Sequence, residues 1–178
     1  MHAEQDRGRE ACTTSAVDLF GFEVQVRFRV HNARLLAYGW HWDGVRAEHH
    51  LDAIVQYHHL PGETLESGEF ETWLLQELEA VVRGGATFEP PRYAYRELSV
   101  WQALIAIPRG NTSTYVDLAK AAGTPYPKLL AILLKNPFQV LLPCHRLVTK
   151  KGTLMGFHPL GVAVKRRLLE LEGVQMGE

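Results

Sequence analysis

The feature that most constrains the fold is a change of character at the proline-containing segment 88–92, in the middle of the chain. Residues 1–95 carry 15 acidic and 8 basic side chains, whereas residues 96–178 carry 5 acidic and 11 basic ones, including every lysine. Pro90-Pro91 at this boundary is typical of a linker, because proline disrupts both helices and sheets. We therefore expect two modules, of which the basic one has a polyanionic partner. Two halves that simply attract each other are the alternative.

The acidic half has the pattern of a small sheet followed by helices. Apolar and polar side chains alternate from Phe22 to Val30, which predicts a half-buried strand. Together with turn residues and helical periodicity, the pattern predicts strands over 22–30 and 35–42 and helices over 47–59 and 69–83. Residues 1–17 are polar and lack the apolar run of a signal peptide, so we expect a flexible tail there. Residues 18–89 would then form an N-terminal α/β domain.

The basic half, residues 90–178, is expected to be mostly helical. Apolar periodicity predicts helices over 98–107, 115–122, 127–135 and 162–172, and a short strand over 147–149 that leads into a turn. The second and third of these helices are short and are separated by the turn Gly123-Thr124-Pro125. This is the pattern of a helix-turn-helix. The predicted fold class is α+β.

The run Pro143-Cys144-His145-Arg146 places a thiol, an imidazole and a guanidinium side by side after an apolar stretch. A cysteine reacts as its thiolate, and an adjacent base with partial burial is a common way to activate one. Taken alone, Cys144 fits a structural buried cysteine better. The other cysteine, Cys12, lies in the expected tail. No disulfide framework is therefore indicated, and we expect a cytoplasmic, reducing location.

Six short motifs follow one another in the basic half. They are Trp101-Gln102-Ala103-Leu104, Ile107-Pro108-Arg109-Gly110, Thr114-Tyr115-Val116-Asp117-Leu118-Ala119, Asn136-Pro137, Pro143-Cys144-His145-Arg146-Leu147-Val148 and Leu168-Leu169-Glu170-Leu171-Glu172-Gly173. In this order they resemble the O6-alkylguanine-DNA alkyltransferases, or methylated-DNA–protein-cysteine methyltransferases. The resemblance covers residues 96–174. It implies an N-terminal ribonuclease-H-like domain of strands and helices, followed by a mostly helical, winged helix-turn-helix-like domain.

The resemblance also implies a DNA repair reaction. A single-turnover protein of this kind moves an alkyl group, such as methyl, from O6 of guanine, and weakly from O4 of thymine, to its own cysteine. Cys144 would be that nucleophile, His145 would draw off the thiol proton through a water, and Glu172 would hold the imidazole. Tyr115 would donate to the departing guanine, and Asn136 would tie the helix-turn-helix to the active-site turn.

Four further residues are implied in recognition of the base. Arg146 and the backbone of Val148 would shape the pocket and read the base edge. Pro159 stands where the family usually offers a backbone N–H to the guanine oxygen, and proline has none. Either His158 or a shifted loop would supply that donor, or the pocket would accept a different lesion.

Double-stranded DNA is the implied partner, bound in the minor groove without sequence preference while the damaged nucleotide is rotated out. The implied DNA-contacting residues are Thr114, Pro127, Lys128, Ala131, Lys135, Lys150 and Lys151. Pro127 occupies the position of the family's arginine wedge, and the nearest cation is Lys128. Residues 129–134 are mainly leucines where the family has small residues, and we expect this stretch to face the core or another copy.

No cofactor and no metal are expected. Six histidines of the first half invite a metal interpretation: His31, His41, His49, His50, His58 and His59. Neighbouring histidines point in different directions, however, and the structural zinc of some family members uses cysteines that this half lacks. No apolar stretch reaches the about 18 residues of a membrane span, so we expect no membrane contact and a monomer.

Two other functions fit parts of the sequence. A non-catalytic sensor that binds alkylated bases would share the fold, although such proteins replace the cysteine that this chain keeps. A cysteine hydrolase that uses Cys144 and His145 is less well supported, because sequence neighbours seldom meet as nucleophile and base.

Overall fold

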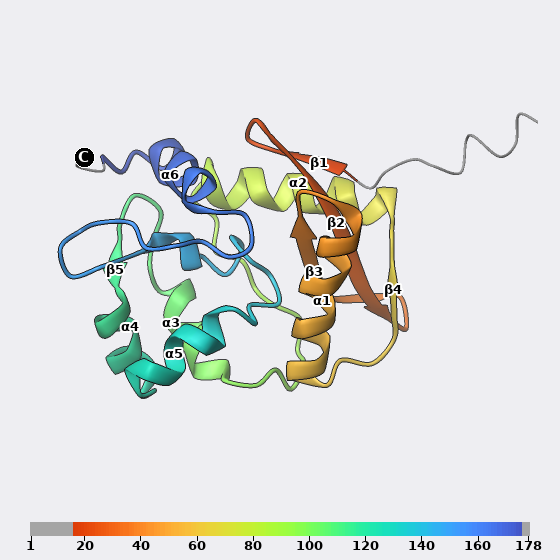
Figure 1. The fold of residues 1–178 in the computed structure, drawn as a ribbon, viewed down its shortest axis with the longest axis horizontal. Helices are drawn as coiled ribbons and strands as arrows, with labels where there is room; N and C mark the ends of the chain where they lie inside the picture. Colours follow the sequence, from red (N-terminus) through yellow and green to blue (C-terminus); the bar gives the residue numbers. More distant parts are fainter. Residues whose placement is uncertain (1–15, 176–178) are drawn as a thin grey trace, which may run out of the picture.

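The computed structural model describes residues 16–175 and confirms the α+β class, with a four-stranded antiparallel sheet beside a group of helices (Figure 1). The strands are β1 (Ala16–Leu19), β2 (Phe22–His31), β3 (Arg34–His41), β4 (Glu63–Leu65), β5 (Ser113–Thr114) and β6 (Leu147–Val148). The helices are α1 (Gly44–His58), α2 (Gly68–Val82), α3 (Leu98–Ile105), α4 (Tyr115–Ala122), α5 (Tyr126–Leu133), the 3-10 turn η2 (Cys144–Arg146) and α6 (Val162–Leu171).

Strand β2 is the centre of the sheet, with β3 along one edge and both β1 and β4 along the other. The alternation that predicted this strand is confirmed, since Val24, Val26 and Phe28 are buried while Glu23 is exposed. The two short edge strands β1 and β4 were not predicted, because three or four residues are too few to show a period.

The predicted tail over 1–17 mostly lies outside the described residues. Its last two residues, Ala16 and Val17, are the start of β1, so the prediction is wrong for them. Val17 is 2% exposed and pairs with Val24 of β2, and this burial of an apolar side chain holds the segment on the sheet.

The two long helices cover opposite faces of the sheet. Helix α1 begins at Asp43, whose carboxylate accepts a hydrogen bond from the Arg46 backbone, and lies so close to β3 that a Cβ at Gly39 would stand 2.5 Å from the Leu51 backbone nitrogen. Helix α2 covers the other face, where Phe70 packs against Phe28 with ring centroids 5.7 Å apart.

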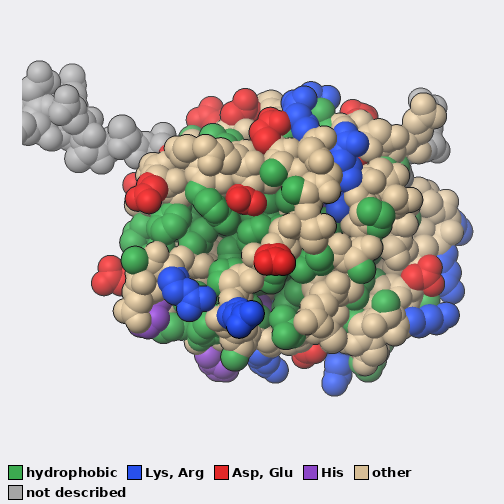
Figure 2. Space-filling view, turned by 180° about the vertical axis from the view of Figure 1, so that it is seen from behind, with side chains coloured by type: hydrophobic (Ala, Val, Ile, Leu, Met, Phe, Trp, Pro, Cys, Tyr) green, Lys and Arg blue, Asp and Glu red, His purple; other side chains and the backbone are tan. Residues whose placement is uncertain are grey.

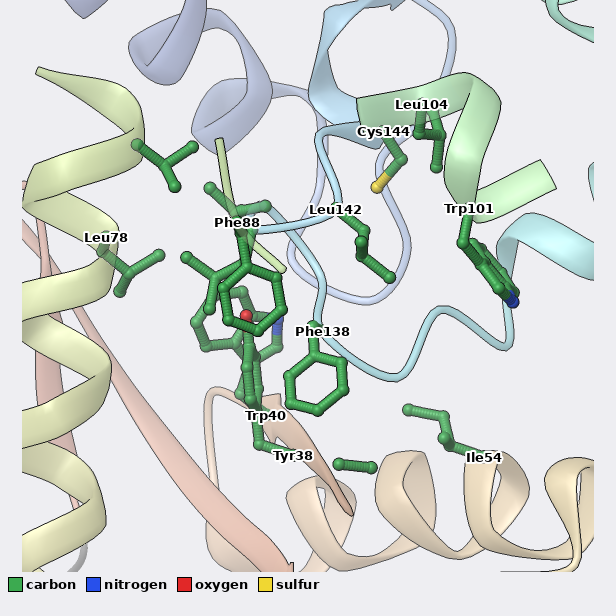
Figure 3. Close-up of a cluster of buried hydrophobic side chains, with 14 of the residues drawn as sticks. Tyr38, Trp40, Ile54, Leu78, Phe88, Trp101, Leu104, Phe138, Leu142 and Cys144 are labelled. Atoms are coloured by element: carbon green, nitrogen blue, oxygen red, sulfur yellow. The ribbon is translucent and has the colours of Figure 1, made fainter. Parts of the chain in front are cut away.

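One continuous cluster of buried side chains runs from Val17 in β1 to Leu168 in α6. Figure 3 shows its centre, where Tyr38 and Trp40 of β3 and Phe88 lie between α2 and the segment that carries Phe138. The charge boundary at 88–92 therefore does not separate two cores.

The helices of the basic half begin and end close to the predicted positions. Thr114 caps α4 by accepting a hydrogen bond from the Asp117 backbone, and Gly123 ends it in the left-handed conformation with φ +66°. Helix α5 follows after three residues and contacts α4. Strand β6 pairs in parallel with β5, and the turn after it is closed by hydrogen bonds between Thr149 and Thr153. Within residues 16–175, no helix is both long and apolar enough to cross a membrane.

The close approach of α1 to β3 generates a stability prediction. Gly39→Ala is expected to lower the free energy of unfolding by about 1–3 kcal/mol, because the added methyl overlaps backbone atoms of Leu51 that cannot turn away. Gly68→Ala is the control, since a Cβ at Gly68 would meet nothing within 4 Å. Urea unfolding of both variants measures the difference, and equal stabilities would contradict the close packing of α1 on β3.

Candidate alkyl-acceptor site

The candidate nucleophile is carried by a tightly braced loop between α5 and η2. Asn136 is 2% exposed and spans this loop, donating to the Leu142 carbonyl over 3.0 Å and accepting from the Phe138 backbone over 2.9 Å. The Cys144 backbone then donates to the Leu142 carbonyl over 2.7 Å and begins η2. The side chain of Asn136 thus connects the residues after α5 to the segment that leads into Cys144.

Gln139 braces the same loop against the sheet, and sequence reasoning missed it. Its side-chain oxygen accepts from the Trp40 indole over 2.6 Å, its amide nitrogen donates to the His158 carbonyl over 2.6 Å, and its backbone carbonyl accepts from the Tyr38 hydroxyl. A glutamine has no sequence signature for such a role, since its three partners lie 19 to 101 residues away.

The backbone next to this brace is strained. Val140 is fully buried and adopts φ +79°, a conformation that costs a β-branched residue about 1–3 kcal/mol. The Val140 backbone also acts on the Cys144 thiol, whose pKa it lowers. The strained residue thus lies in the loop that carries Cys144.

The side chain of Cys144 is 8% exposed and lines a cavity of about 560 Å³. The apolar wall comes from Leu130, Leu133 and Leu134, while Leu129 and Ile132 of the same stretch face the core. The remaining lining residues are Tyr115, Pro127, Ala131, Gln139, Met155, Gly156, Phe157, His158 and Lys165. The leucine-rich stretch thus builds the wall of this cavity as well as part of the core.

Burial raises the pKa of the Cys144 thiol. Hydrogen bonds from Asn136 and from the Val140 backbone, together with the charge of Lys165, favour the thiolate but do not outweigh burial. The thiol is therefore protonated in the free protein, and an attack by the sulfur needs a base that removes its proton.

The imidazole of the neighbouring residue His145 forms a buried pair with Glu172. His145 is completely buried, and its Nε2 lies 3.0 Å from Oε1 of Glu172, which is also buried. A carboxylate only accepts, so Nε2 carries the ring proton and Nδ1 keeps its lone pair. Within the described part of the chain, Nδ1 makes no hydrogen bond to another protein atom.

Burial keeps the imidazole of His145 neutral, whereas its polar neighbours keep the carboxylate of Glu172 ionised. Burial lowers the pKa of His145 and outweighs the opposing effect of Glu172. Burial alone would raise the pKa of Glu172, but hydrogen bonds from His145 and Arg146 and the charge of Arg146 lower it. The result is a neutral base held by a fixed anion.

Arg146 does not occupy the position expected for it. Its guanidinium is buried against Glu172, with Nε 3.0 Å from Oε1, and donates to the carbonyls of Ile107 and Val81. It does not line the Cys144 cavity. The prediction that Arg146 reads the base edge is therefore wrong, because the ion pair to Glu172 holds the guanidinium beside Val81 and Ile107, at a different hollow. Arg146 instead positions Glu172.

A buried lysine, Lys165 of α6, faces the cavity and was also missed. Its Nζ donates to the Tyr115 hydroxyl over 2.8 Å and to the Met155 carbonyl over 3.4 Å. Burial lowers the pKa of Lys165 to about 8, and burial likewise raises the pKa of Tyr115. The sequence did contain a signal, since Lys165 lies on the buried stripe of α6 between Val164 and Leu168.

The other residues implied in base recognition are distributed around the cavity. His158 is exposed and lines it, and its carbonyl is held by Gln139. Val148 is buried in β6, and neither it nor Pro159 is among the lining residues. The expected contacts of Val148 and Pro159 with the base thus have no counterpart in the cavity wall.

Two of the implied DNA-contacting residues line the cavity, and the others lie outside its lining. Pro127 and Ala131 are exposed on α5 and line the cavity, whereas Thr114 caps α4. The four implied lysines are exposed or half-buried: Lys128, Lys135, Lys150 and Lys151. Figure 2 shows basic side chains gathered at the edge of the molecule that corresponds to the α4 and α5 end of Figure 1.

Two of the N-terminal histidines are structural. His50 accepts from the Trp40 backbone over 3.0 Å, and His58 contacts the Lys135 carbonyl and accepts from the Arg96 backbone. No group of three or more His, Cys, Asp or Glu side chains within residues 16–175 is arranged to hold a metal ion.

Comparisons with known proteins agree with this geometry. The family model described as "6-O-methylguanine DNA methyltransferase, DNA binding domain" matches residues 96–174. A methylated-DNA–protein-cysteine methyltransferase of Methanosarcina acetivorans is 35% identical over 120 residues, which cover 64% of this chain and 76% of the relative. That of Saccharolobus solfataricus is 41% identical over 86 residues, 48% of this chain. This match spans about half of the relative, 55% of its length.

The fold has a counterpart among solved structures. The crystal structure of O6-methylguanine-DNA methyltransferase from Pyrococcus kodakaraensis aligns with a TM-score of 0.66 and 21% identity, covering 85% of this chain and 93% of that one. At this identity the likeness concerns the fold, and the sequence relatives carry the family assignment. The chain belongs to the methylated-DNA–protein-cysteine methyltransferase family.

Proposed function

We propose that this protein repairs DNA by moving an alkyl group from O6 of guanine, and weakly from O4 of thymine, onto the sulfur of Cys144. The observation that carries the proposal is the meeting of Cys144, Tyr115 and Lys165 on one apolar cavity beside the buried His145–Glu172 pair. A cavity of about 560 Å³ has room for an extruded purine.

The proton of the thiol has one available acceptor nearby. Nδ1 of His145 takes it, through a bridging water, and Glu172 stabilises the imidazolium that forms. Sγ of Cys144 then attacks the alkyl carbon, so that an S–C bond forms and the bond from that carbon to O6 of guanine breaks. A thioether is not hydrolysed, so each molecule reacts once.

The electron pair released to guanine requires a proton donor on the other side of the cavity. Lys165 already donates to the oxygen of Tyr115, so the phenol keeps its own hydrogen for an acceptor in the cavity. Tyr115 therefore donates to the leaving guanine, and Lys165 stabilises the negative charge that passes to the phenol oxygen.

Helices α4 and α5 are proposed to act as a helix-turn-helix in the minor groove, within a DNA-binding half formed by residues 90–178. Pro127 and Ala131 support this placement, because a duplex lying on the exposed side of α5 would stand at the mouth of the cavity. Rotating the nucleotide out costs a few kcal/mol, and binding to phosphates would make the interaction salt-dependent and independent of sequence. The sheet half, residues 18–89, would brace the loop of Cys144, and the protein would act as a monomer.

Mass spectrometry tests the proposal directly. After incubation with benzylguanine or with a duplex that contains O6-methylguanine, Cys144 is expected to gain one alkyl group, and Cys144→Ser is expected to gain none. Cys12→Ser is the matched control and should react like the original protein. Binding to the modified duplex without any mass gain would instead indicate a sensor, and turnover of an ester substrate would indicate a hydrolase.

The rate of alkyl transfer from benzylguanine is expected to have a bell-shaped pH dependence. The lower limb follows protonation of His145, whose lowered pKa places this limb below the ordinary value of about 6.5. The upper limb follows loss of the charge of Lys165, whose pKa is about 8. Single-turnover rates from pH about 5 to 10 measure both limbs. A rate that rises steadily through this range would instead point to direct ionisation of the thiol.

Lys165→Met is expected to slow alkyl transfer by about tenfold or more and to remove the upper limb. The same variant should be more stable by roughly 1–2 kcal/mol at neutral pH, because below pH 8 the fold buries a charge that the unfolded chain exposes to water. This gain should shrink as the pH rises above 8. Lys120→Met, on the exposed side of α4, is the control, and equal rates for the two variants would contradict the role of Lys165.

A further inference from the structure

A second hollow lies beside the Cys144 cavity and shares the lining residues Leu134 and His158 with it. Its volume is about 260 Å³, and it lies between the start of α1, the end of β3 and the end of α5. Six of its lining residues are basic and none is acidic: His41, Arg46, His49, His50, Lys135 and His158. Four of these six basic residues come from the half of the chain that is acidic overall.

The backbone fixes the tautomers of two of these histidines. Nδ1 of His41 accepts from the Trp42 backbone over 2.8 Å, and Nδ1 of His50 accepts from the Trp40 backbone over 3.0 Å. A neutral imidazole that accepts at one nitrogen carries its proton on the other. Both rings therefore present an Nε2–H donor.

The two cations of the hollow come from different parts of the fold. Arg46 comes from α1 and is paired with Asp43, its Nε lying 2.6 Å from Oδ2, but half of each side chain is exposed. Lys135 comes from the end of α5, and the structure shows no ion pair for its ammonium within residues 16–175. Asp43 is the acidic side chain whose charge acts on His41, and it partly offsets Arg46.

His41, His50 and His158 are neutral at physiological pH because the pKa of each is lowered. Burial, with the charge of neighbouring basic groups, lowers the pKa of His50 to about 3 and also lowers the pKa of His41 and His158. Donors that need no protonation, beside two cations, suit an oxyanion. A metal ion is disfavoured, because the backbone already uses Nδ1 of both His41 and His50.

We propose that this hollow binds a backbone phosphate of the DNA strand that delivers its nucleotide to the Cys144 cavity. The two hollows share the wall of His158 and Leu134, so a strand whose base enters the cavity across this wall would have a phosphate beside the second hollow. Arg46 and Lys135 supply the charge, and the Nε2–H groups of His41 and His50 supply directed hydrogen bonds. The sheet half thus contributes directly to DNA binding. This inference rests on the proposed function.

The test measures equilibrium binding of a duplex that contains O6-methylguanine, at a series of salt concentrations, in the Cys144→Ser background so that no reaction follows. Arg46→Gln and Lys135→Gln are each expected to weaken binding by about three- to tenfold and to reduce the slope of log K against log salt by about one. Arg83→Gln is the matched control, since Arg83 is 53% exposed and ion-paired to Glu79 much as Arg46 is to Asp43.

The outcomes separate the site from the activity. A loss in both Arg46→Gln and Lys135→Gln but not in Arg83→Gln supports the phosphate site. A loss in Lys135→Gln alone overturns it, because the contact would then belong to α5, and equal losses in all three variants overturn it as an effect of net charge. Failure of the proposed function shows itself separately, as the absence of a mass gain on Cys144 with benzylguanine, which carries no phosphate.

Discussion

The carboxylate of Glu172 is the group on which the rest of the site depends. It accepts from His145 on one side and from Arg146 on the other, and both partners are buried with it. A buried carboxylate without such partners would be expensive to keep ionised. The same ion pair joins α6 to η2, and through the carbonyls of Ile107 and Val81 it reaches the ends of α3 and α2. The orientation of the base and the packing of the basic half thus follow from one interaction.

Burial has opposite consequences for the groups around the cavity. It keeps the thiol of Cys144 and the phenol of Tyr115 protonated, and it keeps His145 neutral. For Lys165 it makes the charged form costly to hold. In the proposed reaction, an extruded purine would meet proton donors and acceptors that are already oriented, and these would stabilise the charge that develops during transfer.

The sequence predicted the elements that have a clear period and the residues that form a contiguous motif. The alternation from Phe22 to Val30 and the paired short helices α4 and α5 were placed within two residues of their ends. The pairing of His145 with Glu172 was predicted as well, although 26 residues separate them. That prediction came from the resemblance to the alkyltransferases, because periodicity alone gives no such pairing.

The residues that sequence reasoning missed or misplaced depend on tertiary partners. Gln139 acquires its role from Trp40 and Tyr38, which no local pattern connects to it. Arg146 was misplaced because a guanidinium beside a nucleophile suits substrate binding as well as an ion pair, and only the fold shows which carboxylate it meets. Lys165 is a charged residue on the apolar stripe of α6, but one such position does not by itself indicate a functional site.

The hydrogen bonds of Gln139 bear on whether residues 96–174 could function without the rest of the chain. The stretch matched by the family model, residues 96–174, contains every group that would handle protons or carbon. However, two hydrogen bonds to Gln139 come from β3: the Trp40 indole donates to its side-chain oxygen, and the Tyr38 hydroxyl donates to its backbone carbonyl. A fragment restricted to that stretch would keep these groups but lose the β3 side chains that hold the loop of Cys144. We therefore expect alkyl transfer to require the central sheet as well.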